Sequence, residues 1–165
     1  MSENNIVRLN KGDKAPNFEL ESDEYKHYAL ADFKHQNVVL YFYPKAGTSV
    51  CTREAKDFRD NLERFQAEGY AVIGISPDDV KALQEFRKSN DLNFILLSDP
   101  EFTVHKLYGA YGEKKLYGKI HVGVIRSTLV INPDGSVVIA RYNVRAKGHV
   151  DSLLKALEKL EKLEK

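Results

Sequence analysis

Residues 38–58, VVLYFYPKAGTSVCTREAKDF, pass from one apolar pattern to another within a few positions. Residues 38–43 are almost continuously apolar and rich in β-branched and aromatic side chains, which is typical of a strand buried on both faces. Pro44 follows and ends the strand. Residues 49–68 then carry apolar side chains at helical spacing, which predicts one amphipathic helix. Its apolar stripe consists of Cys51, Ala55, Phe58, Leu62 and Phe65.

Polar residues and a glycine mark the ends of this predicted helix. Thr48 or Ser49 can cap its start with a side-chain oxygen, and Gly69 can end it. Residues 70–76 again have the composition of a buried strand. Residues 77–79, Pro-Asp-Asp, open a second helix that runs to about residue 90. Together these segments predict strand, helix, strand and helix.

The second half of the chain adds three strands and a final helix. The segments are a strand at 94–97, a short helix within 101–108, a long connection at 109–126, strands at 127–132 and 136–142, and a helix from residue 149. Pro133-Asp134-Gly135 joins the last two strands and is a tight-turn signal. Two βαβ crossovers followed by a ββα unit predict an α/β fold, with one mixed central sheet flanked by helices on both faces.

The composition limits the possible partners. The 165 residues carry 25 basic and 24 acidic side chains, for a net charge of +1, so no nucleic acid and no anionic membrane is expected as a partner. We expect residues 1–165 to form a single domain. Residues 1–5 are polar and lack the apolar core of a signal peptide, which favours a cytoplasmic location. The five histidines show no paired ligand spacing, so neither a metal nor another cofactor is expected.

Cys51 is the one cysteine of the chain, which excludes an intramolecular disulfide and a dithiol oxidoreductase with a C-x-x-C pair. Its predicted place is the first turn of a helix, at the solvent-facing carboxyl edge of the sheet. Unpaired backbone N–H groups and the helix dipole favour a thiolate there. A lone cysteine is more often a small buried apolar residue. From its position alone, Cys51 fits a reactive thiol and a packing residue equally well.

Arg126 lies within an apolar segment, residues 120–131. An arginine in such a strand needs an anionic partner or must extend its side chain to the surface. A thiolate at Cys51 is one possible partner and the carboxylate of Glu54 is another, and the sequence pattern leaves both open.

Residues 43–55, YPKAGTSVCTREA, resemble the peroxiredoxin signature P-x-x-x-T-x-x-C. The resemblance is closest to the Q type, also called bacterioferritin comigratory protein. Residues 124–128, VIRST, resemble the segment that carries the active-site arginine of this family. Similar segments occur in the same order along nearly the whole chain. The resemblance implies a thioredoxin-like fold and a thiol peroxidase that reduces hydrogen peroxide and organic hydroperoxides.

The resemblance also assigns roles to five residues. Cys51 is the nucleophile that attacks the peroxide and becomes a sulfenic acid, while Thr48 offers its hydroxyl to the peroxide and the thiolate. Arg126 stabilises the thiolate and the developing oxyanion. Pro44 shapes the loop and shields the site from water, and Glu54 orients Arg126. Ordinary structural roles are the alternatives: a strand end for Pro44, a helix cap for Thr48 and a first-turn acid for Glu54.

Lys56 is a departure from the family pattern, because many Q-type members carry a resolving cysteine at this position. The sulfenic acid on Cys51 must therefore react with an external thiol, such as thioredoxin, glutaredoxin or a low-molecular-weight thiol. The oligomeric state, monomer or homodimer, stays open. A non-catalytic binding or chaperone module in which Cys51 only packs is the competing function, and the presence of Thr48 and Arg126 argues against it.

Two weaker motifs favour surface loops over sites. Residues 112–120 faintly resemble a phosphate-binding loop, but the spacing is one residue too long and Ile120 replaces the required hydroxyl residue. His121 precedes Arg126 by five residues and could approach the site. We expect it to be a solvated loop histidine.

Overall fold

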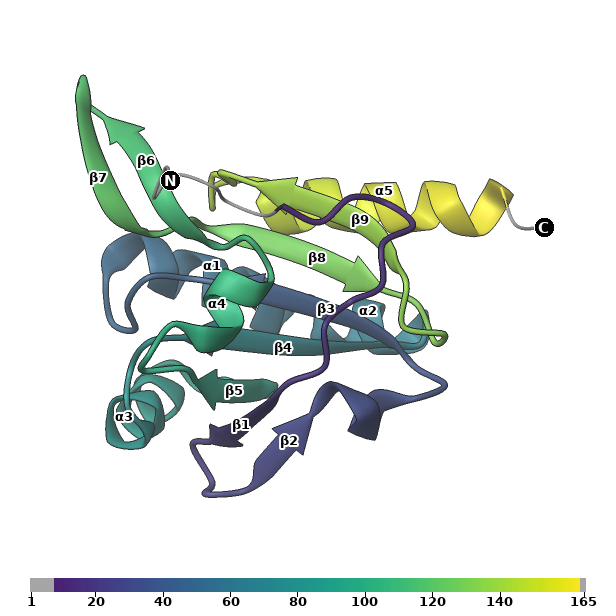
Figure 1. The fold of residues 1–165 in the computed structure, drawn as a ribbon. Coiled ribbons are helices and arrows are strands. Elements are labelled where there is room, and N and C mark those ends of the chain that lie inside the picture. Colours follow the sequence, from purple (N-terminus) through teal and green to yellow (C-terminus); the bar gives the residue numbers. More distant parts are fainter. Residues whose placement is uncertain (1–7, 164–165) are drawn as a thin grey trace.

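The computed structural model of the chain describes residues 8–163. These residues form a seven-stranded mixed sheet and a separate two-stranded hairpin that projects from it (Figure 1). Residues 1–5, on which the expected location depends, lie outside the described part, and the single domain over 1–165 stays a prediction. Within residues 8–163, none of the helices combines the length and the apolar character that crossing a bilayer requires.

The sheet has the strand order β2-β1-β5-β4-β3-β8-β9. Its strands are β1 (Glu19–Ser22), β2 (His27–Ala29), β3 (Asn37–Phe42), β4 (Tyr70–Ser76), β5 (Ile95–Ser98), β8 (Ser127–Ile131) and β9 (Val137–Tyr142). The three central strands β3, β4 and β5 are parallel, whereas each of the others runs antiparallel to its neighbours. The prediction of a mixed α/β sheet is confirmed.

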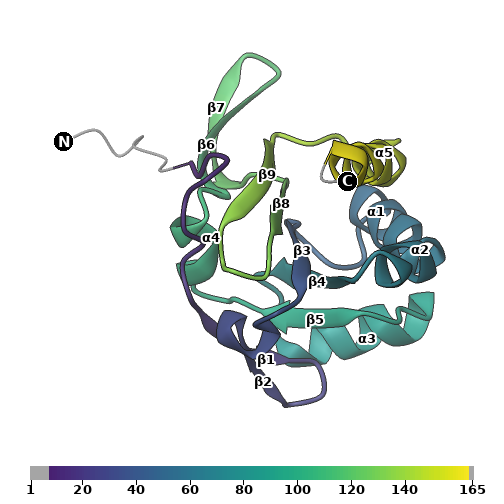
Figure 2. The same cartoon turned by 90° about the vertical axis from the view of Figure 1, so that its right-hand side faces the viewer.

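The helices cover the two faces unequally (Figure 2). One face carries α1 (Ser49–Asp60), α2 (Leu62–Ala67), α3 (Val80–Asn90) and α5 (His149–Leu163), and their apolar residues form one core cluster with the strands. The other face carries α4 (Thr103–Leu107) and the short 3-10 helix η1 (Leu30–Phe33). The unequal cover arises because the crossovers from β3 to β4 and from β4 to β5 step in the same direction.

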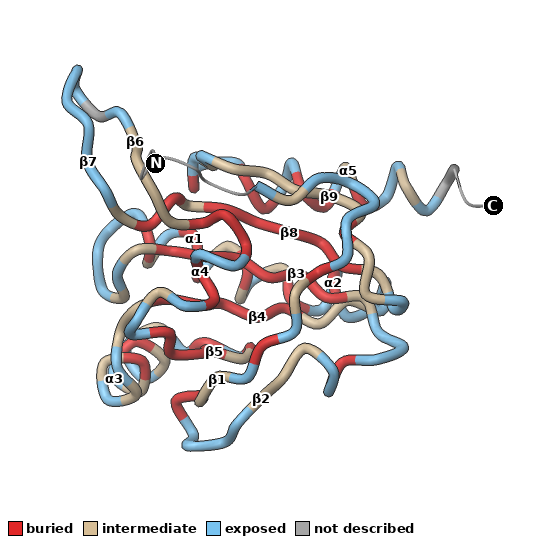
Figure 3. The backbone as a smooth tube through the Cα atoms, viewed as in Figure 1, coloured by how far each residue is buried: buried red, intermediate tan, exposed pale blue. Residues whose placement is uncertain are grey.

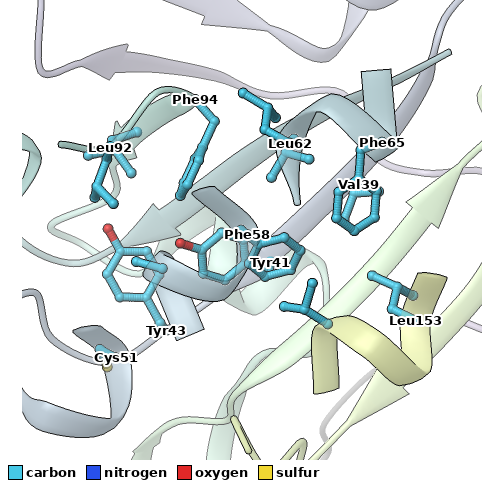
Figure 4. Packing of buried hydrophobic residues seen from close by; sticks show 14 of the residues in the cluster. Val39, Tyr41, Tyr43, Cys51, Phe58, Leu62, Phe65, Leu92, Phe94 and Leu153 are labelled. Atoms are coloured by element: carbon cyan, nitrogen blue, oxygen red, sulfur yellow. The ribbon is translucent and has the colours of Figure 1, made fainter. Parts of the chain in front are cut away.

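Strand β3 is buried on both faces, as its continuous apolar sequence predicts. Val39, Tyr41 and Tyr43 belong to the core cluster under α1, whereas Val38, Leu40 and Phe42 belong to the cluster on the other face. The ring of Tyr41 stacks on Phe58 of α1 with a centroid distance of 4.4 Å. It also lies against Gly74 of β4, where an added Cβ would come within 2.9 Å of a ring carbon. Helix α1 is thus packed onto β3 by an aromatic contact (Figure 4).

The prediction of one helix over residues 49–68 is wrong, because α1 and α2 are separated at Asn61. The side-chain amide of Asn61 donates to the carbonyl oxygen of Asp57 at 2.8 Å, in place of its own backbone N–H. That N–H turns instead to the carbonyl oxygen of Phe58. The apolar stripe still faces the core, because all five of its residues are buried. Gly69 follows the end of α2 with a positive φ of 83°.

The predicted long connection at 109–126 is instead a hairpin of β6 (Tyr111–Leu116) and β7 (Lys119–Val124). Tyr117 and Gly118 both have positive φ, as a two-residue hairpin turn requires. This segment is therefore not a phosphate-binding loop. Most of β7 is exposed, including His121 (Figure 3). Its apolar residues Ile120 and Val122 alternate as in a strand but are exposed, so this alternation does not mark a core face. Strands β1 and β2 and the helix η1 are further elements that the sequence pattern does not predict.

Candidate active site around Cys51

Strand pairing brings the two signature segments together. Strand β8 runs antiparallel to β3, and Phe42 at the end of β3 pairs with Ser127 at the start of β8. Arg126, which directly precedes Ser127, therefore lies beside the loop that leads from β3 into α1. Cys51 lies in the first turn of α1, at the same end of the sheet. Two segments separated by more than seventy residues thus meet at one sheet edge.

The guanidinium of Arg126 joins Cys51 to Glu54. Its Nη2 donates to Cys51 Sγ at 3.2 Å, and its Nη1 donates to Glu54 Oε1 at 2.6 Å. Arg126 therefore binds both of the partners that the sequence leaves open, Cys51 and Glu54. Cys51 also packs with the apolar stripe, at the edge of its core cluster (Figure 4). The expectation of a solvent-facing cysteine is wrong, because only 1% of Cys51 is exposed.

Burial sets the charge balance of this cluster. Glu54 is fully buried, and burial raises the pKa of its carboxyl to about 7, although Arg126 beside it acts in the opposite direction. Burial works to lower the pKa of Arg126, but the charges of Glu54 and Cys51 outweigh it and raise that pKa. The second carboxylate oxygen of Glu54 has no hydrogen-bond partner among the described residues. The cluster therefore holds a permanent cation beside the sulfur, and the charge of Glu54 changes near neutral pH.

The loop before α1 carries Pro44 and Thr48. Pro44 lies two residues after the end of β3 and is partly buried, whereas Thr48 is exposed. Thr48 is the N-cap residue by backbone position, but its hydroxyl donates to the carbonyl oxygen of Lys45 at 2.9 Å and makes no capping bond. The expectation that its side chain caps the helix is therefore wrong. In the described part of the chain, neither Pro44 nor Thr48 is hydrogen-bonded to Cys51.

Asp78 is a residue of this region that the sequence analysis misses. Its Oδ2 accepts hydrogen bonds from the backbone N–H of Ala46, at 2.7 Å, and from the hydroxyl of Ser76, at 2.8 Å. These bonds tie the loop before α1 to the end of β4. The available signal is topological, because β3 and β4 are parallel and the residues that follow them lie at the same edge of the sheet.

Among residues 8–163, no group of three or more histidine, cysteine, aspartate or glutamate side chains is arranged to hold a metal ion.

Comparison with known proteins agrees with this arrangement. A model of the AhpC/TSA family matches residues 11–140. A putative peroxiredoxin of Mycobacterium tuberculosis is 51% identical over 151 residues, which cover 92% of this chain and 96% of that protein. A putative peroxiredoxin, bcp, of Helicobacter pylori is 45% identical over 152 residues, which cover 92% of this chain and all of that protein.

Solved structures support the same assignment. The bacterioferritin comigratory protein of Xanthomonas campestris superposes with a TM-score of 0.81 at 33% identity, covering 86% of this chain and 90% of that one. A peroxiredoxin Q mutant of Xylella fastidiosa gives a TM-score of 0.87 at 30% identity, covering 94% of this chain and 99% of that one. The resemblance seen in the two signature segments is confirmed, and this chain belongs to the AhpC/TSA family, within its Q-type peroxiredoxins, which are thiol peroxidases.

Proposed function

We propose that Cys51 is the nucleophile of this thiol peroxidase and that the protein reduces hydrogen peroxide and organic hydroperoxides. The observation that carries the proposal is the hydrogen bond from Arg126 to Cys51 Sγ, which places a fixed positive charge at the reacting sulfur. The Xanthomonas relative has alkyl peroxide reduction activity, which supports the same substrate class here.

In the first step, the thiolate of Cys51 attacks the terminal oxygen of the peroxide. An S–O bond forms and the O–O bond breaks, so that the sulfur is oxidised to a sulfenic acid and the peroxide is reduced. The leaving hydroxide or alkoxide takes up a proton and departs as water or an alcohol. Arg126 stabilises the thiolate before the attack and the negative charge on oxygen during it.

The remaining site residues prepare this step. Glu54 fixes the orientation of Arg126 through their short ion pair. The hydroxyl proton of Thr48 is engaged with Lys45, so its oxygen lone pairs are available to accept a hydrogen bond from the incoming peroxide. Pro44 fixes the backbone at the point where β3 gives way to the loop.

Regeneration of the thiol requires a reductant from outside the chain. Lys56 occupies the position of the usual resolving cysteine, and Cys51 is the one cysteine present. We propose a one-cysteine cycle that draws on thioredoxin, glutaredoxin or a low-molecular-weight thiol. Cys51, Arg126 and Glu54 all come from one chain, so the reaction can proceed in a monomer or in each subunit of a homodimer. The predicted cytoplasmic location suits a reaction that depends on a supply of reduced thiols.

Intact-mass spectrometry after one equivalent of hydrogen peroxide tests this function. With a sulfenic-acid trap such as dimedone present, we expect a single adduct on Cys51. Without the trap or any thiol, excess peroxide should drive Cys51 to sulfinic acid. The Cys51→Ser variant is the control, since its hydroxyl can still accept from Arg126. Continued peroxide consumption by this variant, or reduced unmodified protein after confirmed turnover without thiol, would contradict the mechanism.

A further inference from the structure

A shallow groove of about 530 Å³ lies next to the guanidinium of Arg126. One side is formed by Ser49, Val50 and Arg53 of α1, and the other by residues 144–147, which connect β9 to α5. Arg126 lines the groove and also donates to Cys51 Sγ. The groove therefore leads to the group that holds the reactive sulfur.

The groove is strongly cationic. Arg53, Arg145 and Lys147 line it, are exposed, and have no ion-pair partner among the described residues. Among residues 8–163, no acidic side chain lines the groove. Asp57 is the next acidic residue along α1 after Glu54. Burial raises the pKa of Asp57 and the charge of Arg53 acts against this, but the two side chains form no ion pair. Since the chain as a whole carries a net charge of only +1, three unpaired cations at one groove are a local feature that favours an anionic ligand.

In the second half of the proposed cycle, a thiol reduces the sulfenic acid on Cys51. The chain has no second cysteine to supply this thiol. A resolving thiol reacts as its thiolate, an anion, whereas hydrogen peroxide is neutral. A cationic groove therefore raises the local concentration of the thiolate and not that of hydrogen peroxide. Val50 is 51% exposed and offers an apolar contact beside the cations. The volume is in the range of small-molecule sites.

We propose that this groove binds the external reductant, a small thiol that carries at least one carboxylate. The inference rests on the proposed function of Cys51. Arg145 and Lys147 hold the carboxylate, and Arg53 and Arg126 face the sulfur end of the ligand. Cys51 is almost completely buried, so a thiolate bound at Arg126 cannot reach Cys51 Sγ directly. The first turn of α1 must open before the two sulfurs can react.

The chemistry balances with two thiol molecules. The first thiolate attacks Cys51 Sγ, an S–S bond forms, the S–O bond breaks, and hydroxide leaves and is protonated to water. A second thiolate then attacks the ligand sulfur of the mixed disulfide. Cys51 departs as a thiolate, and the two thiols are released as one oxidised disulfide.

Three small thiols of different charge test this proposal. Cys51 is first oxidised with one equivalent of peroxide, and loss of the sulfenic acid is then timed by quenched mass spectrometry with mercaptopropionate, mercaptoethanol or cysteamine. Rate constants are expressed per thiolate and are divided by the rate constants of the same thiols with a small-molecule disulfide, because the nucleophilicity of a thiolate also falls as its pKa falls. We expect the anionic mercaptopropionate to react about tenfold faster than neutral mercaptoethanol at low salt, with cysteamine slowest, and the differences to shrink with added salt.

Charge-reversal variants locate the effect. Arg145→Glu combined with Lys147→Glu should remove the preference for mercaptopropionate and favour cysteamine, while the rate with mercaptoethanol stays within about twofold. The double change to glutamine should give an intermediate result. Lys159→Glu changes the net charge by the same amount as the double glutamine variant, but at an exposed position of α5 outside the groove. It is the matched control for that variant and should leave the preference intact.

The outcomes separate this inference from the proposed function. If no sulfenic acid forms on Cys51, the proposed function fails. If it forms but all three thiols react equally, or the groove variants behave like Lys159→Glu, the reductant site is refuted. A loss confined to oxidation by a carboxylate-bearing hydroperoxide, with thiol rates unchanged, would assign the groove to the peroxide and also refute it.

Discussion

Replacing Arg126 with alanine removes the cation that donates a hydrogen bond to the reactive sulfur. The donor nitrogen lies 3.2 Å from Cys51 Sγ, and opposite unit charges at about 4 Å interact by roughly 4 kcal/mol near a protein surface. Loss of one preorganised donor slows an enzymatic step by about 10²–10³, which corresponds to a similar energy. We therefore expect the rate constant for oxidation of Cys51 by peroxide to fall by about 10²–10³. The variant Arg126→Lys should recover only part of this rate, because lysine lacks the planar guanidinium that binds both Cys51 and Glu54.

The same substitution leaves Glu54 buried without its partner. Breaking a buried pair in this way costs about 3–5 kcal/mol of stability when the remaining group is charged. The pKa of Glu54 is raised to about 7 in the folded protein, above its ordinary value of 4.5, and loss of Arg126 removes an interaction that lowers it. Because the folded state then retains a proton that the unfolded state releases, stability decreases as pH rises across that interval. Arg126→Ala should thus be least stable at alkaline pH.

A double variant separates the chemical effect from the structural one. Arg126→Ala with Glu54→Gln has no buried charge to leave unpaired, so we expect urea unfolding to show recovered stability and to lack the loss of stability that Glu54 causes as pH rises. Peroxide oxidation, followed by quenched mass spectrometry with a sulfenic-acid trap, should stay slow. If the double variant regains both stability and the wild-type rate, Arg126 acts only through the fold. If Arg126→Ala itself oxidises at the wild-type rate, the argument for its catalytic role is refuted.

Three further substitutions test single contacts. Thr48→Val should slow oxidation at least about tenfold and change the melting temperature little, because the hydroxyl caps no helix and its hydrogen bond to Lys45 is exposed; unchanged kinetics would remove Thr48 from the site. Asp78→Asn should speed amide hydrogen exchange at Ala46 and slow oxidation, since Oδ2 accepts two hydrogen bonds that fix the loop; unchanged exchange would refute the anchoring role. Gly74→Ala should lower the free energy of unfolding in urea by about 1–3 kcal/mol through overpacking; a neutral result would show that Tyr41 moves aside freely.

Much of the fold can be predicted because burial against the core determines how apolar residues recur along the sequence. Residues 38–43 and 70–76 are buried on both sides, so their apolar runs identify β3 and β4 directly. The pairing of Cys51 with Arg126 follows from the signature segments, since the topology of the family places both at one edge of the sheet. The sequence alone leaves open whether Arg126 binds the thiol or Glu54, because one planar guanidinium can bind both.

Most of the missed features depend on local contacts or on packing, which the apolar pattern of the sequence does not report. The hairpin at 111–124 is missed although Ile120, Val122 and Val124 alternate in β7, because the four glycines and scattered charges of residues 109–126 are typical of a connection. The break at Asn61 depends on one side-chain amide that competes with the backbone, which leaves the apolar stripe intact. Burial of Cys51 depends on how closely α1 packs on the sheet, which periodicity does not report. The cations at 145 and 147 lie in a connection without a regular pattern, and only the folded chain places them beside Arg126.

The close approach between Tyr41 and Gly74 has an evolutionary consequence. The ring at position 41 stacks on α1, the helix that carries the reactive cysteine, and it occupies the space where any larger residue at position 74 would place its Cβ. Substitutions at the two positions are therefore not independent, because a side chain at 74 lowers stability as long as the aromatic ring at 41 stays in place. Across diverging descendants of this chain, positions 41 and 74 should co-vary, and the ancestral pair should persist wherever α1 keeps its aromatic contact with the sheet.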